Sequence, residues 1–594
     1  MPAMSNPLFR ERDIEFVLYD VLHAEELTRL AAFADHDRGS FDMTIESVRR
    51  FARTTLQPTY KALDEDPPRL VDGRVIVHPR LKALFPELSA LGLVVAGRPA
   101  AVGGQQLPRI IHTFAAAYLM AANLSAYGYI GLAAGAAHLL ETFGSDELRA
   151  TYMAPIYEGR WLGTMALTEP QAGSSLADVA TRATPVPDGS YRISGAKIFI
   201  SAGDHDLTEN IVHMVLARID GAPPGTRGVS LFCVPKRRVE GTGLVDNDVA
   251  VAGVIHKIGW RALPSLALAF GDRGDCHGWL VGQPHRGLAA MFQMMNEARI
   301  MVGMNGVATA SVAYHEALAY ALDRTQGRPL EAKDPTSAPI AIIEHADVRR
   351  MLLRQKAIVE GGLCLIGRTA IYADLAEHAP EPAQRTRAQR LLDLLTPVAK
   401  SFPAERGFEA NALALQVHGG YGYTSEYLVE ALMRDQKLNS LHEGTTGIQG
   451  LDLLGRKVVA DGGAGLAALR EEIMTTAAAA RTAGIDERLV GAVTEALRTV
   501  EVLTATLAAK GLAGDVGGML LHSTDYLELF GILVIAWQHL AMAAVAHTPD
   551  AALNEGKRLA ADYWISTEIP RLTALAELCR SGEDSYRRIR PGEL

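Results

Sequence analysis

The sequence predicts an α+β multidomain protein in which helical regions flank a central β-barrel or sandwich. Three observations lead to this fold class. The chain has 594 residues, and single hydrophobic cores stop growing near ~250–300 residues. Its composition, 48% hydrophobic and 21% charged, is typical of a folded globular protein. A β-rich segment within residues 191–235 is preceded and followed by long stretches of helical periodicity.

The N-terminal part of the chain is predicted to be helical. Residues 13–34 place apolar side chains at helical spacing, and we assign residues 1–40 to an N-terminal helical extension. Residues 41–162 continue the helical pattern and form a predicted N-terminal helical domain. Breaks in that pattern are expected at Pro67-Pro68 and Gly103-Gly104, because proline and glycine end regular elements.

A β-barrel domain is predicted over residues 163–283. Residues 191–194 and 197–200 flank Gly195-Ala196, a pattern that predicts a tight hairpin. Further short β-rich runs follow, separated by glycine and proline turns such as 222–225 (APPG).

From residue 284 the pattern returns to long amphipathic helices. Four of them predict an up-down bundle in a domain spanning 284–461; these helices are expected at 287–323, 340–377, 384–417 and 425–459. Gly462-Gly463-Ala464-Gly465 is typical of a linker. Residues 466–594 then form a predicted C-terminal helical domain.

Charge and cysteine content exclude several classes of protein. The net charge of −10 and pI of about 6.0 give no overall field that attracts nucleic acid. The four cysteines are scattered without CxxC spacing, so we predict neither a disulfide framework nor a metal site and expect a cytoplasmic protein. No secretory signal is expected, because residues 1–12 lack a long apolar run. Residues 530–546 have no formal charge but fall short of the ~20 that a membrane span needs, so a buried helix is expected.

The motif with the most chemical information is 441–449 (LHEGTTGIQ), which contains an isolated carboxylate, Glu443. Alone, a Glu-Gly pair is more typical of a helix C-cap. Three further motifs accompany it at 167–175 (LTEPQAGSS), 416–422 (QVHGGYG) and 434–437 (RDQK). In this order, and over about residues 80–460, they resemble the acyl-CoA dehydrogenase family.

The resemblance implies an FAD-dependent enzyme that desaturates an acyl-CoA thioester between its α and β carbons. Glu443 would remove the α-proton, and its backbone N–H would donate to the thioester carbonyl. Burial by acyl chain and flavin would make this carboxylate a better base by raising its pKa. Flavin N5 would take the β-hydride.

The resemblance also implies a set of binding residues. The expected FAD contacts are Met165, Leu167, Thr168, Ser174, Phe199, Ser201, Arg324, Gln416, Gly419, Gly420, Thr445 and Gln449. The expected substrate contacts are Ser174, Arg299 and Gly444. Simpler interpretations remain open: Ser174 or Ser175 as a helix N-cap, Phe199 as a core residue and Arg324 as a solvated helix-end charge. Phe199 and Ser201 stand where the family often has Trp and Thr.

Partners follow from the same resemblance. Arg324 matches a family residue that approaches the FAD of a neighbouring subunit, which implies a homodimer or tetramer. The expected electron acceptor is an electron-transferring flavoprotein, and an acyl-CoA oxidase is a related alternative.

The long C-terminus resembles a subgroup acting on long straight-chain acyl-CoAs or 3-methylthiopropanoyl-CoA, and the length of the acyl chain stays open. The other alternative is a flavin-containing nucleic-acid-binding relative. Residues 461–594 disfavour it, because 12 Lys and Arg against 18 Asp and Glu leave a net charge of −6.

Overall fold

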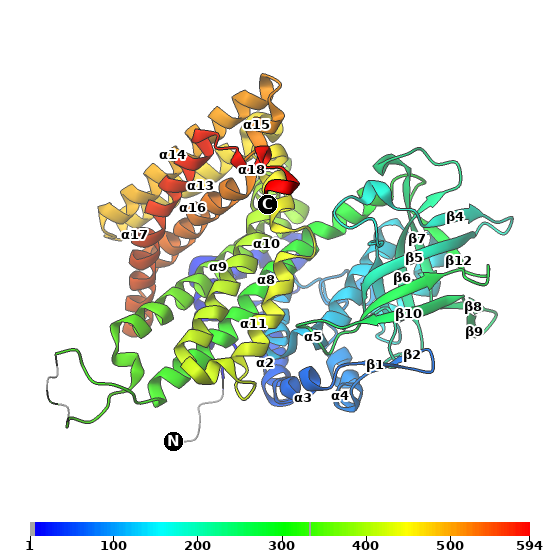
Figure 1. Ribbon diagram of the computed structural model, residues 1–594, viewed down its shortest axis with the longest axis horizontal. Coiled ribbons are helices and arrows are strands. Elements are labelled where there is room, and N and C mark those ends of the chain that lie inside the picture. The colour runs from blue at the N-terminus through cyan, green and yellow to red at the C-terminus, as the bar shows by residue number, and fades with distance from the viewer. Residues whose placement is uncertain (1–5, 332–333, 335) are drawn as a thin grey trace. The chain divides into compact units, whose positions relative to one another are not determined.

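The computed structural model describes residues 6–331, 334 and 336–594 and divides the chain into two compact units (Figure 1). One unit comprises residues 38–298, and the other comprises residues 6–37 together with 299–594. Both units bury many apolar side chains completely.

The first half of the 38–298 unit is helical, as predicted. Its α-helices are α2 (Arg38–Phe51), α3 (Tyr60–Glu65), α4 (Pro79–Ala90), α5 (Arg109–Phe143), α6 (Asp146–Leu148) and α7 (Ala154–Tyr157). The apolar helix α5 is interrupted at Asn123, whose φ of −164° and ψ of 99° are not helical. The Asn123 side chain accepts a hydrogen bond from the Ala126 N–H at 3.1 Å and so caps the second half of the helix. A short hairpin of β1 (Arg69–Val71) and β2 (Arg74–Ile76) separates α3 from α4.

The second half of this unit is an eight-stranded sheet. Its strands are β3 (Leu162–Ala166), β4 (Arg182–Pro185), β5 (Tyr191–Ser201), β6 (Ile211–Ile219), β7 (Val229–Pro235), β10 (Val249–Ile255), β11 (Ser265–Phe270) and β12 (His277–Val281). β5 pairs with β12, β12 with β7, β7 with β6, β6 with β4, and β4 again with β5, so these strands close a ring. The closed ring confirms the predicted barrel, and Ile193, Val215 and Phe232 lie in its apolar core. A separate hairpin, β8 (Arg237–Glu240) with β9 (Gly243–Asp246), adjoins it in the chain.

The predicted hairpin at Gly195-Ala196 is wrong. Both residues lie inside the continuous strand β5, where Gly195 pairs with Phe270 and Ala196 with Ala269 of β11. The glycine serves close packing instead of a turn. A Cβ on Gly195 would lie 2.9 Å from the Thr181 Cα and 2.6 Å from its Oγ1, so a side chain would push Thr181 out of position.

The other unit contains the predicted helix bundle. It is formed by α8 (Gly287–Asp323, from Arg299 onward), α9 (Ala346–His378), α10 (Pro382–His418) and α11 (Val429–Lys437). Two glycines bring α8 and α10 into close contact: a Cβ on Gly303 would lie 2.1 Å from the Ala399 carbonyl oxygen, and one on Gly306 would lie 2.6 Å from that of Pro403. The expected single helix over 425–459 is broken. After α11 and a 3₁₀ turn, the chain leaves the helix at 441–445 and resumes as α12 (Thr446–Asp452).

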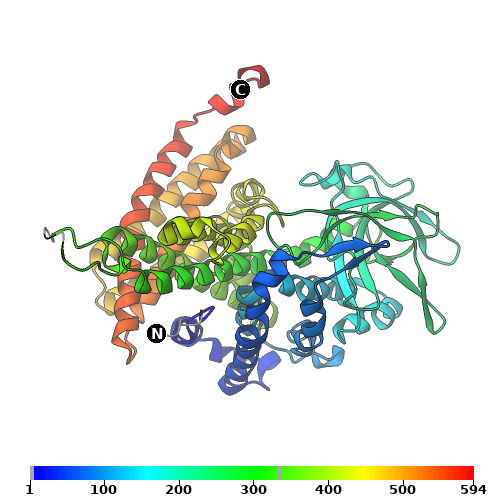
Figure 2. The same cartoon turned by 60° about the horizontal axis from the view of Figure 1, so that its bottom comes forward.

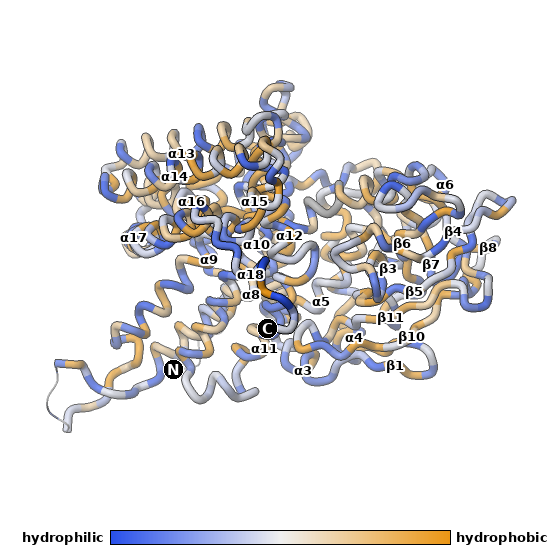
Figure 3. The backbone as a smooth tube through the Cα atoms, turned by 45° about the horizontal axis from the view of Figure 1, so that its top comes forward, coloured by the Kyte–Doolittle hydropathy of each residue, from blue (hydrophilic) through white to orange (hydrophobic). Residues whose placement is uncertain are grey.

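The C-terminal region is helical, as predicted. Its long helices are α13 (Ala464–Thr482), α14 (Glu487–Leu512), α16 (Ser523–Ala544) and α17 (Ala551–Ser581), with the shorter α15 (Val516–Leu520) and α18 (Ser585–Arg588). The long helices run side by side in both views (Figures 1 and 2), and hydrophilic and hydrophobic positions alternate along α13 and α14 (Figure 3). Among the described residues, α16 alone is long and apolar enough to cross a membrane, and 89% of its most apolar stretch is buried inside the protein.

The N-terminal segment 6–37 belongs to this second unit. Asn6 Nδ2 donates to the Val312 carbonyl at 3.0 Å and to a carboxylate oxygen of Glu316 at 2.7 Å, both on α8. The buried Lys557 of α17 pairs with Asp13 at 2.7 Å and with Glu360 of α9 at 3.0 Å. The segment thus joins the bundle to the C-terminal helices.

Candidate functional site

In the barrel unit, the loop that follows β3 is held by a buried lysine. Met165 lies near the end of β3, and Leu167 and Thr168 follow it. Lys197 of β5 donates from Nζ to the Leu167 carbonyl at 3.0 Å and to the Leu216 carbonyl at 2.7 Å. The Ile198 N–H donates to the Thr168 carbonyl at 2.9 Å. The backbone of the loop is therefore fixed from β5.

Glu169 completes this anchor. Its carboxylate accepts from Lys197 Nζ at 2.7 Å, from the Thr181 hydroxyl at 2.6 Å and from the backbone N–H of Ala180 at 2.7 Å. Burial works against the charge, but Lys197 and these hydrogen bonds lower the Glu169 pKa to about 2. Burial also lowers the Lys197 pKa to about 8.

Phe199 lies on a bulge of β5. The register between β5 and β11 shifts between the pairs Leu266–Ile200 and Leu268–Lys197. Phe199 has a left-handed φ of 59°, and 61% of its surface is exposed. The core interpretation of Phe199 is therefore wrong: the bulge turns its ring out of the sheet. Ser201 lies two residues further on, opposite Ser265.

Ser174 is exposed in the loop after Glu169. The segment that follows is only a three-residue 3₁₀ turn, Leu176–Asp178. Ser175 precedes that turn without a capping hydrogen bond to its backbone, and its hydroxyl donates instead to Asp178 Oδ2 at 2.8 Å. The helix N-cap expected at Ser174 or Ser175 is not formed.

In the second unit, Glu443 lies in a left-handed turn between α11 and α12. Its φ is 52°, and Gly444 follows with a φ of 88°. A glutamate in this conformation is strained, so the surrounding contacts must hold it. Two side chains do so: Lys400 Nζ of α10 donates to the Gly444 carbonyl at 2.7 Å, and Gln449 Nε2 of α12 donates to the Glu443 carbonyl at 3.0 Å.

The Glu443 side chain is half-buried and has two cations nearby, Arg299 and Lys400. Burial raises its pKa above the ordinary value, while the charges of Arg299 and Lys400 act in the opposite direction. Burial also lowers the pKa of Lys400 to about 8, against the influence of Glu405 and Glu443. Within the described residues, the Glu443 backbone N–H donates to no carbonyl.

Arg299 is buried in an ion pair with Asp452 that the sequence does not predict. Its Nη1 lies 2.9 Å from Asp452 Oδ2, and the two side chains are 5% and 3% exposed. Asp452 Oδ1 accepts a second ion pair, at 2.8 Å, from Arg456. The charge of Arg299 is thus balanced inside the protein beside Glu443.

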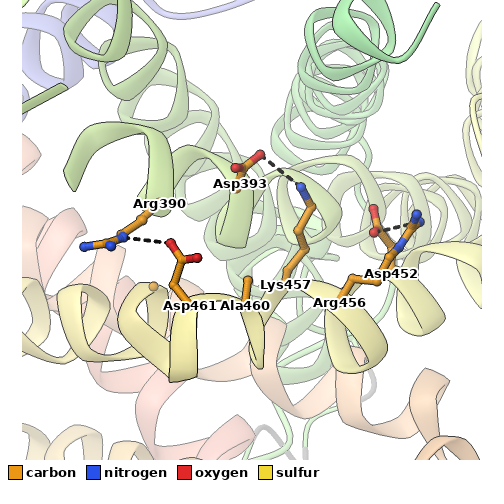
Figure 4. A pocket seen from close by; sticks show the side chains of 8 residues that line it. Arg390, Asp393, Asp452, Arg456, Lys457, Ala460 and Asp461 are labelled. Carbon is orange, nitrogen blue, oxygen red and sulfur yellow. Dashed lines mark hydrogen bonds and ion pairs between the residues drawn. The ribbon is translucent and has the colours of Figure 1, made fainter. Parts of the chain in front are cut away.

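Asp452 and Arg456 line a cavity of about 240 Å³ between α10 and the start of the C-terminal helices (Figure 4). The charged residues that line it form ion pairs across or along its wall: Arg390–Asp461 at 3.3 Å, Lys457–Asp393 at 2.9 Å and Arg456–Asp452 at 2.8 Å. Each basic side chain in the wall has an acidic partner, so the cavity provides no excess charge for a charged ligand.

The structure brings Arg324 close to the glycine-rich loop after α10. Tyr320 lies one turn before Arg324, and its ring stacks on His418 with centroids 4.4 Å apart. His418 lies between Gln416 and Gly419. Four residues here are exposed: Arg324, Gln416, Gly419 and Gly420. The Arg324 guanidinium donates to the side-chain oxygen of Gln326 over a long distance of 3.4 Å.

Thr445 and Gln449 serve the turn itself. The Thr445 hydroxyl accepts from the Ile448 N–H at 3.4 Å and caps α12. Gln449 is fully buried, and within the described residues its Oε1 accepts no hydrogen bond.

Three residues of these arrangements were missed in the sequence: Lys197, Lys400 and Asp452. A usable signal existed for Lys400, which is the only charged residue from 394 to 404 in an otherwise apolar stretch of helix. A lysine in such a position is expected to meet an acceptor in the interior.

Four domain families match the chain in the order of these elements. They are the acyl-CoA dehydrogenase N-terminal domain over 40–160, the middle domain over 164–272, the C-terminal domain over 285–458, and the acetyl-CoA dehydrogenase C-terminal-like domain over 469–589.

Curated relatives match over most of their length. A 3-methylmercaptopropionyl-CoA dehydrogenase of Ruegeria pomeroyi is 38% identical over 551 residues, 91% of each chain. A broad-specificity linear acyl-CoA dehydrogenase of Mycobacterium tuberculosis is 34% identical over 97% of each chain. A butyryl-CoA dehydrogenase of Syntrophomonas wolfei is 35% identical over 77% of this chain and 76% of its own.

Solved structures share the fold. Caenorhabditis elegans ACDH-11 in complex with C11-CoA superposes with a TM-score of 0.77 at 19% identity, over 97% of this chain and 95% of that one. A Bacillus anthracis acyl-CoA dehydrogenase complexed with FAD gives a TM-score of 0.74 at 20% identity, over 95% and 91%.

Proposed function

The chain belongs to the acyl-CoA dehydrogenase family, and we propose that it desaturates an acyl-CoA between the α and β carbons with Glu443 as the base. The observation that supports this most directly is the geometry at Glu443. A half-buried carboxylate with a raised pKa is held in a strained turn. A base of this kind takes a proton from a weak carbon acid better than a solvated carboxylate does.

FAD is the cofactor of the family, and the residues present fit it. The loop of Leu167 and Thr168 is rigid, so its backbone groups are preorganised to meet a ring. Phe199 offers an exposed aromatic face, and Arg324 offers an exposed guanidinium suited to a pyrophosphate. When bound, FAD supplies a hydride acceptor. Met165, Ser174, Ser201, Gln416, Gly419 and Gly420 are proposed to complete its contacts.

Glu443 and the turn around it have two tasks in this proposal. The carboxylate takes the α-proton, and the Glu443 N–H, which no carbonyl of the described chain occupies, donates to the thioester oxygen. Gly444 allows close approach of the thioester, because its φ of 88° suits glycine and no side chain stands there. Arg299 is assigned a different role from the predicted CoA contact. Its guanidinium is paired with Asp452 and is therefore not assigned to CoA. Its proposed role is electrostatic: its positive charge favours the ionised form of Glu443.

Unbranched acyl-CoAs are the proposed substrate class. The relatives named above act, by their names, on 3-methylmercaptopropionyl-CoA, linear acyl-CoAs and butyryl-CoA, and the acyl groups of all three are unbranched. Thr445 and Gln449 are proposed to keep the turn in place for such substrates, Gln449 from inside the protein.

The proposed assembly is a homodimer or tetramer in the cytoplasm that passes electrons to an electron-transferring flavoprotein. Support for the assembly comes from four exposed residues at the ends of α8 and α10: Arg324, Gln416, Gly419 and Gly420. Oxygen as the acceptor, as in an acyl-CoA oxidase, is the second candidate.

Anaerobic flavin bleaching tests the function. The purified holoprotein is mixed with a panel from propanoyl-CoA to octadecanoyl-CoA that includes 3-methylthiopropanoyl-CoA and a branched control, isobutyryl-CoA. Rapid bleaching by unbranched members and formation of the enoyl-CoA are expected. A flavin that no acyl-CoA reduces would show that the proposal is wrong.

A further inference from the structure

Lys400 occupies an unusual position for a lysine. It lies on α10 between Ala399 and Pro403, the two residues whose carbonyls Gly303 and Gly306 of α8 approach. Its side chain is fully buried. Nζ reaches the Gly444 carbonyl at 2.7 Å, and this carbonyl belongs to the residue directly after Glu443. A buried ammonium is costly unless it is hydrogen-bonded or paired with an opposite charge, so its contacts indicate what it stabilises.

The turn at Glu443 needs external support. Glu443 and Gly444 are both left-handed, with φ of 52° and 88°, and a non-glycine residue persists in this region only where its surroundings hold it there. Regular helix bonds do not pass through this turn. The carbonyls of its two left-handed residues are instead bonded to side chains, Glu443 to Gln449 and Gly444 to Lys400.

A third bond closes the same region. The Thr446 hydroxyl at the start of α12 donates to Glu405 of α10, one turn beyond Lys400. The bonds from Lys400 and to Glu405 thus fasten the base-bearing segment to one helix. That helix is itself fixed against α8 by the glycine contacts described above.

We propose that Lys400 is a positioning residue that holds the left-handed turn and thereby aims the Glu443 carboxylate at the substrate. The inference rests on the proposed function of Glu443 and adds a residue to that site. The Lys400 ammonium group fixes the Gly444 carbonyl. It also places a second positive charge near the Glu443 carboxylate, in addition to that of Arg299, which comes from a different helix.

The charges around Glu443 within its unit set the expected pH behaviour. Arg299 comes from α8 and is balanced by Asp452 of α12; Lys400 comes from α10, with Glu405 nearby. His442 precedes the base in the chain. Lys400 favours the ionised form of Glu443, so its removal raises the pKa of the base further. The acid limb of the pH–rate profile is the range in which the rate rises with pH as the base ionises. This limb should then move to higher pH.

The test compares Lys400→Met with Lys400→Arg in the full-length FAD-loaded enzyme. In Lys400→Met we expect kcat to fall roughly 10²-fold, the penalty typical of a reacting group displaced by about 1 Å, with KM changed much less. Its acid limb should move to higher pH. Lys400→Arg retains a donor and a charge and should recover most of the rate and the original limb.

Lys557→Met is the matched control. Lys557 is as buried as Lys400 and pairs with Asp13 and Glu360 in the same unit, but it does not contact the turn. This variant should lose thermal stability with an unmoved acid limb. If Lys400→Met does not fold, Lys400→Gln provides the neutral variant, and the same upward movement of the limb is expected.

The outcomes are distinct. A Lys400 variant without its charge that keeps the wild-type rate and limb overturns the inference, and so does one that loses rate while its limb stays fixed as in Lys557→Met. In both cases a wild-type enzyme that reacts with acyl-CoA, and a Glu443→Gln variant that does not, leave the proposed function intact. A wild-type enzyme that reacts with no acyl-CoA overturns both.

Discussion

Lys197 and Glu169 form an ion pair inside the barrel unit, with Nζ 2.7 Å from Oε1 and side chains 0% and 3% exposed. Glu169 also binds the backbone at Ala180 and Thr181, while Lys197 binds the carbonyl of Leu167. The pair therefore connects the loop proposed to meet the flavin with β5 and the start of β4. Replacing a whole buried pair by apolar residues is often neutral for stability, whereas removing one partner is strongly destabilising.

Removing one partner of this pair should lower the free energy of unfolding far more than replacing both partners together. Glu169→Leu leaves the buried Lys197 ammonium without a counter-charge, and a loss of about 3–5 kcal/mol in the free energy of unfolding is expected. The double variant Glu169→Leu/Lys197→Met should lose much less than the sum of the single variants. Urea unfolding measures both. The exposed pair Arg498–Glu495 is the control, and Glu495→Leu should leave the unfolding curve almost unchanged. Additive losses at the buried pair would contradict this view.

The same pair should make stability depend on acid pH. The Glu169 pKa is lowered from 4.5 to about 2 in the folded protein, so the ionised form stabilises the fold above pH 4.5. This contribution should diminish as pH falls from about 4.5 to about 2. The difference in urea midpoint between wild type and Glu169→Gln should shrink over that interval. A difference that stays constant would show that the carboxylate is not ionised through the pair.

Local patterns predicted the helices and the barrel, because periodicity reports which face of an element is buried. They failed where tertiary contact decides the conformation. Gly195 is typical of a turn in isolation, yet it lies within a strand because Thr181 packs against it. The break at Glu443 was obscured for a related reason. Residues 425–459 have helical periodicity, but the chain makes a left-handed turn at Glu443. The carbonyls of that turn accept hydrogen bonds from Lys400, 44 positions away, and from Gln449 on the next helix, and local periodicity does not report such contacts.

The site residues show the same division. The motif around Glu443 could be recognised from sequence, but the partners that set its charge could not, since Asp452 meets Arg299 across 153 positions. Ion pairs between distant segments depend on how helices pack, and α8 and α12 meet only in the folded unit.

Asp452→Asn should move the pH profile in the direction opposite to Lys400→Met. The variant leaves the charge of Arg299 uncompensated beside Glu443, which lowers the pKa of the base. The acid limb of kcat should move to lower pH, and the rate at high pH should fall because a weaker base removes the proton. Arg456→Ala removes the exposed partner of the same carboxylate and should leave the limb in place. An unmoved limb in Asp452→Asn would mean that Arg299 does not act on Glu443.

Arg324→Ala should weaken FAD retention and subunit association together. Among the described residues, the exposed Arg324 guanidinium has only the 3.4 Å contact with Gln326, so it is suited to a pyrophosphate. Loss of such a charge-assisted contact costs about 2 kcal/mol. Arg328 in the same loop is the control, because its Nε already donates to the Ser337 carbonyl at 2.7 Å. FAD titration of the apoprotein and sedimentation give the two readouts. Equal FAD affinity in wild type and Arg324→Ala would identify Arg324 as a solvated helix-end residue.

Glu443→Gln should retain FAD and bind acyl-CoA, yet fail to reduce the flavin. The amide has nearly the shape of the carboxylate but cannot accept the α-proton, so ground-state binding survives while the transition state is lost. Loss of a general base is worth about 10²–10⁴-fold, and coupling to hydride transfer can enlarge it. Because burial raises the Glu443 pKa, the wild-type rate should rise with pH as this group ionises, and the variant should lack that limb. Glu430→Gln, which alters a carboxylate paired with Arg434 on α11, should behave like wild type. Stopped-flow flavin reduction across pH distinguishes these cases, and rapid reduction by Glu443→Gln would assign proton removal to a different carboxylate.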